Sequence, residues 1–312
     1  MTGFKIMSLS LMASLLIASA AVGQTAIFAN DFEDDAVGPY TVSNWSADWS
    51  GAPGETGIEE GRATIVSGDA AFNGGRSLRL LYPKGSVGAV GPSGGGAEWR
   101  MNLGQSHDEL YLSYRIRFGA DFDFVLGGKL PGLAGGAGNT GGNTPNGTDG
   151  WSARMMWVTY GPAPGDRANA IQYVYHPDQP GTFGHNIRWD DTADGSWAEF
   201  EADRWYSFQH RIIMNTPGQY DGAIQAWLDG ELVLDMDGLR FRDVATLGVD
   251  QLLFSTFFGG GSANWAPTKD EFIFFDDFVV STGPITVPEP SLAISLAIGA
   301  GALAALRFAL KD

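Results

Sequence analysis

The chain has 312 residues, no cysteine and a formal net charge of −17. The acidic balance argues against a nucleic-acid partner, and the lack of cysteine means that an exported form must be stable without disulfides. Between two terminal segments lie roughly 260 residues, enough for one large core, and all-β domains often reach this size as a single unit.

The first residues have the pattern of a secretory signal peptide. Lys5 precedes an apolar run over residues 6–22, with small residues at Ala20 and Gly23 near its end. The pattern predicts a signal peptide over residues 1–23. A transmembrane anchor is the alternative, although the apolar run is short for a membrane span.

The middle of the chain has the period of β-strands. Residues 110–118 and 206–214 alternate between apolar and polar side chains, and Asp229-Gly230 predicts a hairpin turn within residues 222–234. Further strands are predicted at residues 62–66, 77–82, 152–160, 170–176, 251–257 and 271–280.

No long internal segment has a helical period. Many short strands separated by Gly, Pro, Asn and Asp predict an all-β fold, a jelly-roll β-sandwich of two antiparallel sheets over residues 24–285. Residues 85–96 and 135–150 are rich in glycine and predict long loops, which are usually functional or mobile. The second loop directly follows a lysine-containing segment and is a candidate lid.

That segment, Gly-Gly-Lys-Leu-Pro-Gly-Leu over residues 127–133, surrounds a lysine with glycines and a proline. Lysine is scarce: between residues 24 and 286 the chain has Lys84, Lys129 and Lys269. Glycine allows close backbone approach, and lysine pairs with anions. The segment therefore predicts a cation that meets an anionic ligand. A glycine-rich turn with an exposed lysine is the alternative.

Two pairs of polar residues follow on predicted strands. Ser152 and Arg154 are two residues apart and share a strand face, as do Tyr173 and Tyr175. Each pair alone is weak evidence for a site. Ser152 and Arg154 could lie on a solvated face, and the two tyrosines could pack in the core. Together with Lys129 they form a set of two cations, two phenols and one hydroxyl on neighbouring strands.

This set suits β-elimination from a uronic acid better than hydrolysis through paired carboxylates. A cation beside the substrate carboxylate stabilises the enolate-like transition state that forms when the C5 proton leaves. Nearby positive charge favours the phenolate of a tyrosine, which could take that proton, and a second donor would protonate the 4-O leaving group. The scheme needs no metal and no organic cofactor.

The succession Gly-Gly-Lys-Leu-Pro-Gly-Leu, Ser-x-Arg and Tyr-x-Tyr resembles polysaccharide lyase family 14, which contains alginate and glucuronan lyases with a β-jelly-roll fold. The resemblance extends over about residues 77–280. It implies an acidic polysaccharide substrate, and it implies that the functional residues are Lys129, Ser152, Arg154, Tyr173 and Tyr175. The task of the lysine stays open between neutralising the carboxylate and lowering the pKa of a tyrosine.

Other residues are candidates for substrate binding. His185 could contact substrate, and Arg188 could add positive charge to a groove or cap a sheet edge. Trp265 could stack on a sugar ring, and Lys269 could meet a substrate carboxylate. His176 faces away from its neighbouring tyrosine on a regular strand, which favours a structural role.

Acidic residues cluster near both ends of the predicted domain. Hard oxygen ligands of this kind can build a calcium site where terminal strands pair. An exposed acidic edge is the favoured interpretation, so no metal site is predicted. The cluster consists of Glu33, Asp34, Asp35, Asp276 and Asp277.

The last residues, 286–312, predict a sorting segment. Pro-Glu-Pro at residues 288–290 precedes an apolar run over 291–306 and the basic Arg307 and Lys311. The segment resembles the PEP-CTERM sorting signal of Gram-negative bacteria. The resemblance implies sorting and processing machinery as a partner, membrane contact only through the terminal segments, and export to the cell envelope or the medium.

The leading hypothesis is an exported polyuronate lyase that cleaves alginate or glucuronan and leaves a 4,5-unsaturated uronate end. The alternative is a non-catalytic carbohydrate-binding module on the cell envelope. A glycoside hydrolase is a third hypothesis, but the only nearby acidic pair, Glu199 and Glu201, is a thin basis for hydrolysis.

Overall fold

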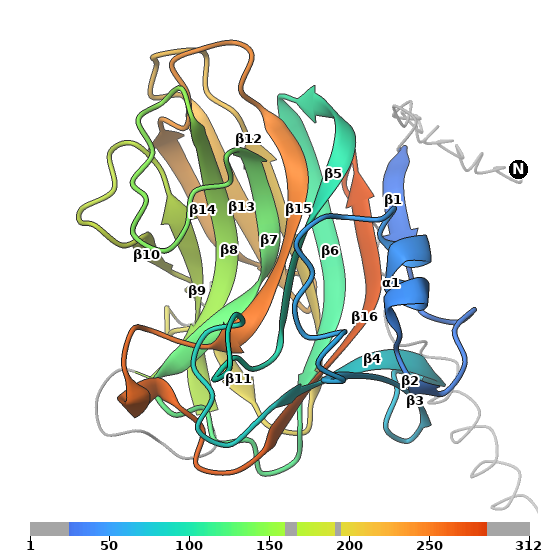
Figure 1. The fold of residues 1–312 in the computed structure, drawn as a ribbon. Helices are drawn as coiled ribbons and strands as arrows, with labels where there is room; N and C mark the ends of the chain where they lie inside the picture. The colour runs from blue at the N-terminus through green and yellow to red at the C-terminus, as the bar shows by residue number, and fades with distance from the viewer. Residues whose placement is uncertain (1–24, 160–166, 191–194, 286–312) are drawn as a thin grey trace, which may run out of the picture.

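Two antiparallel β-sheets stack face to face in a computed structural model that describes residues 25–159, 167–190 and 195–285 (Figure 1). The predicted signal peptide and sorting segment lie outside these residues. Within the described ranges, no helix has the length and apolar character that crossing a membrane requires.

The first sheet contains nine strands, and β1 (Ala26–Asn30) joins it by pairing with β16. The other strands lie in the order β14 (Glu231–Leu239), β13 (Gly222–Leu228), β12 (Trp205–Ile213), β6 (Glu109–Phe118), β16 (Glu271–Ser281), β4 (Gly74–Tyr82), β3 (Ala63–Gly68) and β2 (Gly38–Pro39).

The second sheet contains seven strands, and β11 (Glu199–Glu201) joins it by pairing with β9. The other six lie in the order β10 (His185–Arg188), β9 (Arg167–Tyr175), β8 (Gly150–Val158), β7 (Gly127–Gly136), β15 (Val249–Phe258) and β5 (Ala97–His107).

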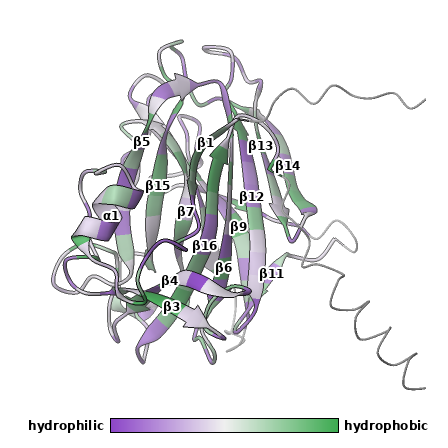
Figure 2. Ribbon diagram, turned by 90° about the vertical axis from the view of Figure 1, so that its right-hand side faces the viewer, coloured by the Kyte–Doolittle hydropathy of each residue, from purple (hydrophilic) through white to green (hydrophobic). Residues whose placement is uncertain are grey.

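Aromatic side chains fill the space between the sheets. Alternation along the strands sends one residue in two into this core, and Figure 2 shows hydrophilic and hydrophobic bands following one another along the strands. Trp99 and Phe254 stack with ring centroids 3.8 Å apart, and Tyr114 stacks on Phe278 at 4.9 Å. The predicted all-β sandwich of two antiparallel sheets is confirmed.

The predicted hairpin is also confirmed. Strands β13 and β14 meet at Asp229 and Gly230, whose φ angles of 52° and 83° are those that a tight two-residue hairpin turn needs. One short helix has no counterpart in the prediction: α1 (Val42–Asp48), whose first turn is capped by Thr41 and Asn44. The sequence also did not predict six of the strands, namely β1, β2, β5, β7, β10 and β11.

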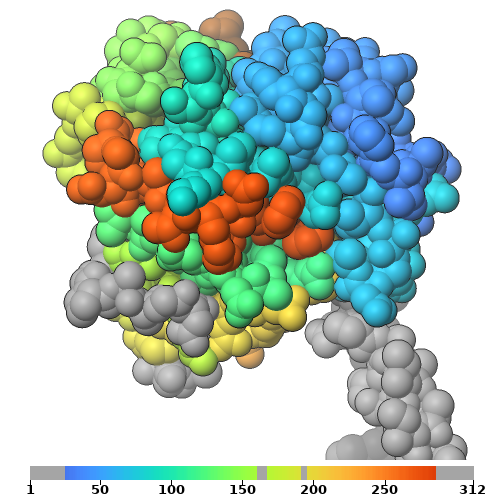
Figure 3. Space-filling view, turned by 60° about the horizontal axis from the view of Figure 1, so that its bottom comes forward, coloured from blue at the N-terminus to red at the C-terminus, as the bar shows by residue number. Residues whose placement is uncertain are grey.

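The glycine-rich residues 85–96 form a packed connection. The Gly88 amide donates to the Phe258 carbonyl (2.9 Å), and the Gly85 amide donates to the Pro267 carbonyl (2.9 Å). Figure 3 shows this loop, in teal, lying against the orange residues that connect β15 to β16. The guanidinium of Arg62, next to β3, donates to three carbonyls of the loop, those of Ala89, Gly94 and Gly96, and so ties the loop to the first sheet.

Candidate active site

The lysine segment is a strand in the interior of the second sheet. Residues 127–133 belong to β7, which pairs with β8 on one side and β15 on the other, so the alternative of an exposed lysine in a turn is wrong. Pro131 lies where the β7–β8 register shifts between Leu130 and Gly132. A proline lacks the amide that a ladder needs, and a bulge accommodates it within a sheet.

The glycines of β7 serve packing within the protein. A Cβ atom at Gly128 would lie 2.1 Å from the Trp157 ring, and one at Gly132 would lie 2.1 Å from the Ala153 carbonyl oxygen. The sequence predicted close backbone approach at this segment, and the approach is real. However, the groups that come close at these two positions are a core tryptophan and a neighbouring strand, and no ligand is required to explain the glycines.

Register brings the predicted catalytic residues together on the face of the second sheet that points away from the core. Across β8 and β9, Ser152 lies opposite Tyr175 and Arg154 lies opposite Tyr173. Lys129 lies on the adjacent strand β7. The predicted sharing of faces within each pair is therefore confirmed.

A cavity of about 550 Å³ opens over these strands, and we call it the lysine pocket. None of its lining residues is an aspartate or a glutamate. It is lined by Lys129, Gly141, Arg154, Met156, Tyr173, Tyr175, Phe183, Gly184, Asn186, Phe257, Gly259, Gly260, Gly261 and Trp265.

Lys129 is buried in the floor of this pocket. Its Nζ lies 4.2 Å from the centroid of the Tyr173 ring, 2.9 Å from the Met156 sulfur and 3.3 Å from the Gly259 carbonyl, to which it donates. Desolvation, together with the positive charge of Arg154, lowers the pKa of Lys129 well below that of an ordinary lysine. The pocket therefore favours a neutral amine at this position.

The two tyrosines form a pair of phenols. Their hydroxyl oxygens are 3.5 Å apart, and each accepts a hydrogen bond from a backbone amide: Tyr173 from Gly184 (3.2 Å) and Tyr175 from Gly142 (3.1 Å). Burial and the neighbouring Tyr175 raise the pKa of Tyr173, despite the opposing effect of Arg154. Arg154 favours the phenolate of Tyr173, as expected, but burial and Tyr175 outweigh this effect.

Arg154 is held in place from the far side of the pocket. Its Nη1 donates to the Ser255 hydroxyl (3.0 Å), which in turn donates to the Glu98 carboxylate (2.8 Å). The Nε atom of Arg154 is buried and has no hydrogen-bond partner among the described residues. Arg154 lines the pocket, where a substrate carboxylate is a suitable partner for an arginine.

Ser152 does not line the lysine pocket. Its side chain is fully buried, and its hydroxyl donates to the Asn139 carbonyl (2.6 Å). Asn139 belongs to the connection over residues 137–149, which also supplies the Gly142 amide to Tyr175. The predicted loop therefore lies beside the site, as expected, and Ser152 acts on the pocket by holding that loop.

His185 and Arg188 lie outside the pocket. His185 pairs with Val174, whose side chain faces the core, and its Nδ1 lies 3.2 Å from Nε2 of His176. Burial lowers the pKa of His176 to about 4, which agrees with its predicted structural role. Arg188 forms an ion pair with Asp190 and stacks over the Trp197 ring at 4.8 Å.

The two remaining candidates behave differently from each other. Trp265 lines the lysine pocket, beside Gly127 on the strand that also carries Lys129. Lys269 does not: its amine donates to the Asp121 carbonyl (2.8 Å) and pairs with the buried Glu271 (2.8 Å). Lys269, which the sequence assigned to a substrate carboxylate, therefore pairs with a carboxylate of the protein itself.

Sequence reasoning missed three side chains of the pocket, namely Met156, Phe183 and Asn186. Met156 follows Arg154 by two residues, so the rule of alternation on β8 could have found it. Asn186 lies opposite Tyr173 across the β9–β10 pair, which only the register reveals. Phe183 lies in a connection whose position the sequence does not fix.

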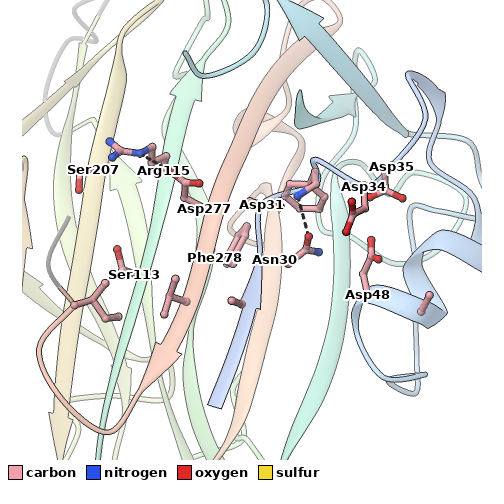
Figure 4. A pocket seen from close by; sticks show the side chains of 15 residues that line it. Asn30, Asp31, Asp34, Asp35, Asp48, Ser113, Arg115, Ser207, Asp277 and Phe278 are labelled. Atoms are coloured by element: carbon pink, nitrogen blue, oxygen red, sulfur yellow. Dashed lines mark hydrogen bonds and ion pairs between the residues drawn. The ribbon is translucent and has the colours of Figure 1, made fainter. Parts of the chain in front are cut away.

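An acidic hollow of about 560 Å³ lies on the other sheet, between the N-terminal segment and β6, β12 and β16. Its aspartates come from the β1–β2 connection, α1 and β16, and Arg115 pairs with Asp277 at 2.7 Å (Figure 4). In the described part of the chain, no group of three His, Cys, Asp or Glu residues is arranged to hold a metal ion. Its carboxylates are Asp31, Asp34, Asp35, Asp48 and Asp277.

The fold and the lysine pocket define a β-sandwich protein with a site for an anionic ligand and the groups for acid–base chemistry. The family model "Polysaccharide lyase 14" matches residues 71–278, and the chain belongs to this family. The protein is therefore a polysaccharide lyase. A search of curated proteins finds no match.

Solved structures agree with this assignment. An alginate lyase, Aly36B, crystallised as a lysine-and-tyrosine-to-alanine variant with an alginate tetrasaccharide, is 26% identical with a TM-score of 0.69, covering 83% of this chain and 98% of its own. The PL-14 alginate lyase from Aplysia kurodai is 24% identical with a TM-score of 0.67, covering 83% and 100%. The jelly-roll form of the predicted sandwich is confirmed.

Proposed function

We propose that this protein is an exported lyase that cleaves a polyuronate, alginate or glucuronan, by β-elimination. The observation that carries the proposal is the convergence of Lys129, Arg154 and Tyr173 in a pocket without carboxylates. The Lys129 amine and the Arg154 guanidinium lie over one phenol ring, at 4.2 Å and 5.7 Å from its centroid. Such a site attracts a uronate carboxylate and offers donors and acceptors of protons, but it lacks the paired acids of a hydrolase.

The first task of the site is to bind the substrate carboxylate at Arg154. Arg154 lines the pocket, and the Ser255–Glu98 chain holds its guanidinium in place. Neutralising the carboxylate stabilises the negative charge that develops on it when the C5 proton is removed.

The second task is proton transfer. Lys129, whose pKa is lowered by burial, takes the C5 proton as a neutral amine. The electron pair of the C5–H bond forms the C4=C5 double bond, and the C4–O4 bond breaks. The tyrosine pair donates a proton to the leaving oxygen, and Tyr173 is suited to this because its raised pKa keeps it protonated at neutral pH.

Solved structures of the relative Aly36B point to the same residue types. Aly36B was crystallised with alginate oligosaccharides as two variants, one lacking a lysine and a tyrosine and the other lacking a lysine and a methionine. The same residue types, Lys129, Tyr173 and Met156, meet in the lysine pocket. An endo-β-1,4-glucuronan lyase from Trichoderma reesei shares the fold, at 15% identity and a TM-score of 0.50.

Export is part of the proposal and rests on the terminal sequences. The signal-peptide pattern over residues 1–23 and the Pro-Glu-Pro segment over residues 286–312 support secretion and later sorting at the envelope of a Gram-negative bacterium. The mass of the protein isolated from its native host tests this part, since an uncleaved N-terminus would contradict it.

One assay tests the activity. The purified domain is incubated with polymannuronate, polyguluronate and glucuronan, and the ultraviolet absorbance of the unsaturated product is followed. We expect the absorbance to rise together with reducing ends on at least one polymer. Reducing ends without absorbance would indicate a hydrolase. Binding without either signal would indicate the carbohydrate-binding module, and both outcomes would overturn the lyase proposal.

A further inference from the structure

The connection between β9 and β10, residues 176–184, is built to hold a fixed shape beside the tyrosines. His176 and His185 close its base through their 3.2 Å contact. Gln179, whose side chain is almost fully buried, donates to the carbonyls of Gly181 (2.8 Å) and Thr182 (3.2 Å). These internal hydrogen bonds replace the ladder that the connection lacks, so its tip has a defined position.

Gly184 seats the connection directly on the tyrosine pair. A Cβ atom at this position would lie 2.8 Å from the ring of Tyr175 and 3.0 Å from the ring of Tyr173. Only a glycine allows this approach, which lets the Gly184 amide donate to the Tyr173 hydroxyl. The residue before Gly184 therefore has a fixed position relative to the two tyrosine side chains.

That residue is Phe183, and its ring is left in solvent. It is 66% exposed, although it lines the lysine pocket. A Cβ atom at Gly142 would lie 3.6 Å from the Phe183 ring, so the ring stands where the two connections that donate amides to the tyrosines meet. Trp265 also lines the pocket, beside Gly127 and Gly260.

We propose that Phe183 is a substrate-binding residue, on whose ring a sugar unit of the polyuronate stacks beyond the tyrosine end of the lysine pocket. The proposal rests on the lyase function proposed above. The CH face of a pyranose ring is apolar and packs on an aromatic face, while its carboxylate and hydroxyls stay in water. A rigid, exposed phenyl ring on the rim of a cleft that binds an anionic polymer provides such a face without adding charge.

The position of the ring predicts which kinetic constant it affects. The hydrogen bonds of the tyrosine pair go to the Gly184 and Gly142 amides and to each other, and the phenyl ring of Phe183 has no group that transfers a proton. Stacking on it would contribute equally to the ground state and the transition state, which changes KM and leaves kcat unchanged. It would also matter only for chains long enough to reach the rim.

The test compares Phe183→Ala, Phe183→Tyr and the unaltered protein on polymer and on a series of shorter oligosaccharides. We expect Phe183→Ala to raise KM for the polymer about fivefold to tenfold, with kcat within about twofold. The rise should vanish for the shortest oligosaccharides that are still cleaved, and the distribution of product lengths should change. Phe183→Tyr should restore the KM.

A control is Val37→Ala, because Val37 is an exposed hydrophobic residue (58%) in the β1–β2 connection that does not line the lysine pocket. It should leave KM and product lengths unchanged. An unaltered polymer KM in Phe183→Ala, or a fall in kcat that Phe183→Tyr does not restore, would overturn the proposal. If the unaltered protein released no unsaturated product, the lyase function itself would be wrong. Titrating oligosaccharides into Phe183→Ala and the unaltered protein would then show separately whether the ring binds sugar.

Discussion

The lysine pocket and the acidic hollow have nearly equal volumes, about 550 and 560 Å³, and lie on different sheets of the same sandwich. They differ in the sign of their charge. The hollow gathers five aspartates around Arg115, whereas the pocket holds Lys129 and Arg154 and no carboxylate. The charge that a ligand meets is set by the side chains that converge on one cavity, and the net charge of −17 does not predict it.

The two regions also bury their ionisable groups with different consequences. In the pocket, burial shifts Lys129 toward its neutral form, which is useful to a base. Near the hollow, burial raises the pKa of Asp276 to about 7 and that of Asp48 to about 6, which makes their ionised forms costly. Desolvation thus serves chemistry in one region and lowers stability at neutral and higher pH in the other.

The largest effect is expected for Lys129→Ala. Removing the proposed base should lower kcat by about 10³-fold without changing the melting temperature by more than a few degrees. Lys129→Arg is the informative control, because an arginine keeps the positive charge but cannot accept the proton. Comparable losses in both variants support a base, whereas substantial activity in Lys129→Arg would assign Lys129 to neutralising the carboxylate.

Tyr175→Phe should reduce kcat by about 10²-fold. The substitution removes one hydroxyl of the tyrosine pair and the acceptor for the Gly142 amide, but keeps the buried ring. Tyr173→Phe should have a similar effect if the two hydroxyls act as a pair. A rate near that of the unaltered protein in both variants would show that the proton donor lies elsewhere.

The pH dependence of kcat/KM should reflect Lys129. Below the pKa of this residue in the free protein, the rate should fall about tenfold per pH unit, because the base is protonated. That limb should lie well below the range of an ordinary lysine, since burial and Arg154 lower the pKa. An acidic limb that stayed unchanged after Arg154→Gln would contradict the coupling between the two cations.

Ser152→Ala should have a smaller effect, about fivefold on kcat. The hydroxyl holds the Asn139 carbonyl, so its loss should loosen residues 137–149 and weaken the amide contact to Tyr175. Ser152→Thr keeps a hydroxyl and should recover part of the rate if its methyl group is accommodated. A loss as large as that of Lys129→Ala would mean that Ser152 touches substrate directly.

Asp276→Asn should change stability and leave activity unaltered. The pKa of Asp276 is about 7 in the folded protein and near 3.9 when unfolded, so the folded state binds an extra proton between these values. Stability therefore falls as pH rises from 4 to 7. The variant should melt several degrees higher than the unaltered protein at pH 8, and the gain should shrink at pH 4.5. An equal gain at both pH values would contradict the titration.

Local features of this protein follow from short stretches of its sequence. Alternation in residues 110–118 and 206–214 fixed which face of β6 and β12 meets the core, and Asp229-Gly230 fixed a hairpin, because strand faces and tight turns depend on neighbouring residues. Spacing by two also placed Arg154 with Ser152 and Tyr173 with Tyr175. The resemblance of these motifs to polysaccharide lyase family 14 then identified the five functional residues, which the strand register brings onto adjacent strands.

Only the tertiary structure decided what those side chains face. Ser152 and Arg154 share a strand face, yet one holds a loop and the other lines the pocket. Lys269 was assigned to substrate and instead pairs with Glu271, and Phe183 was not recognised. Burial, ion pairing and the shift of a pKa depend on residues distant in the chain, whose positions are set by the register of the two sheets and by the connections that cross them.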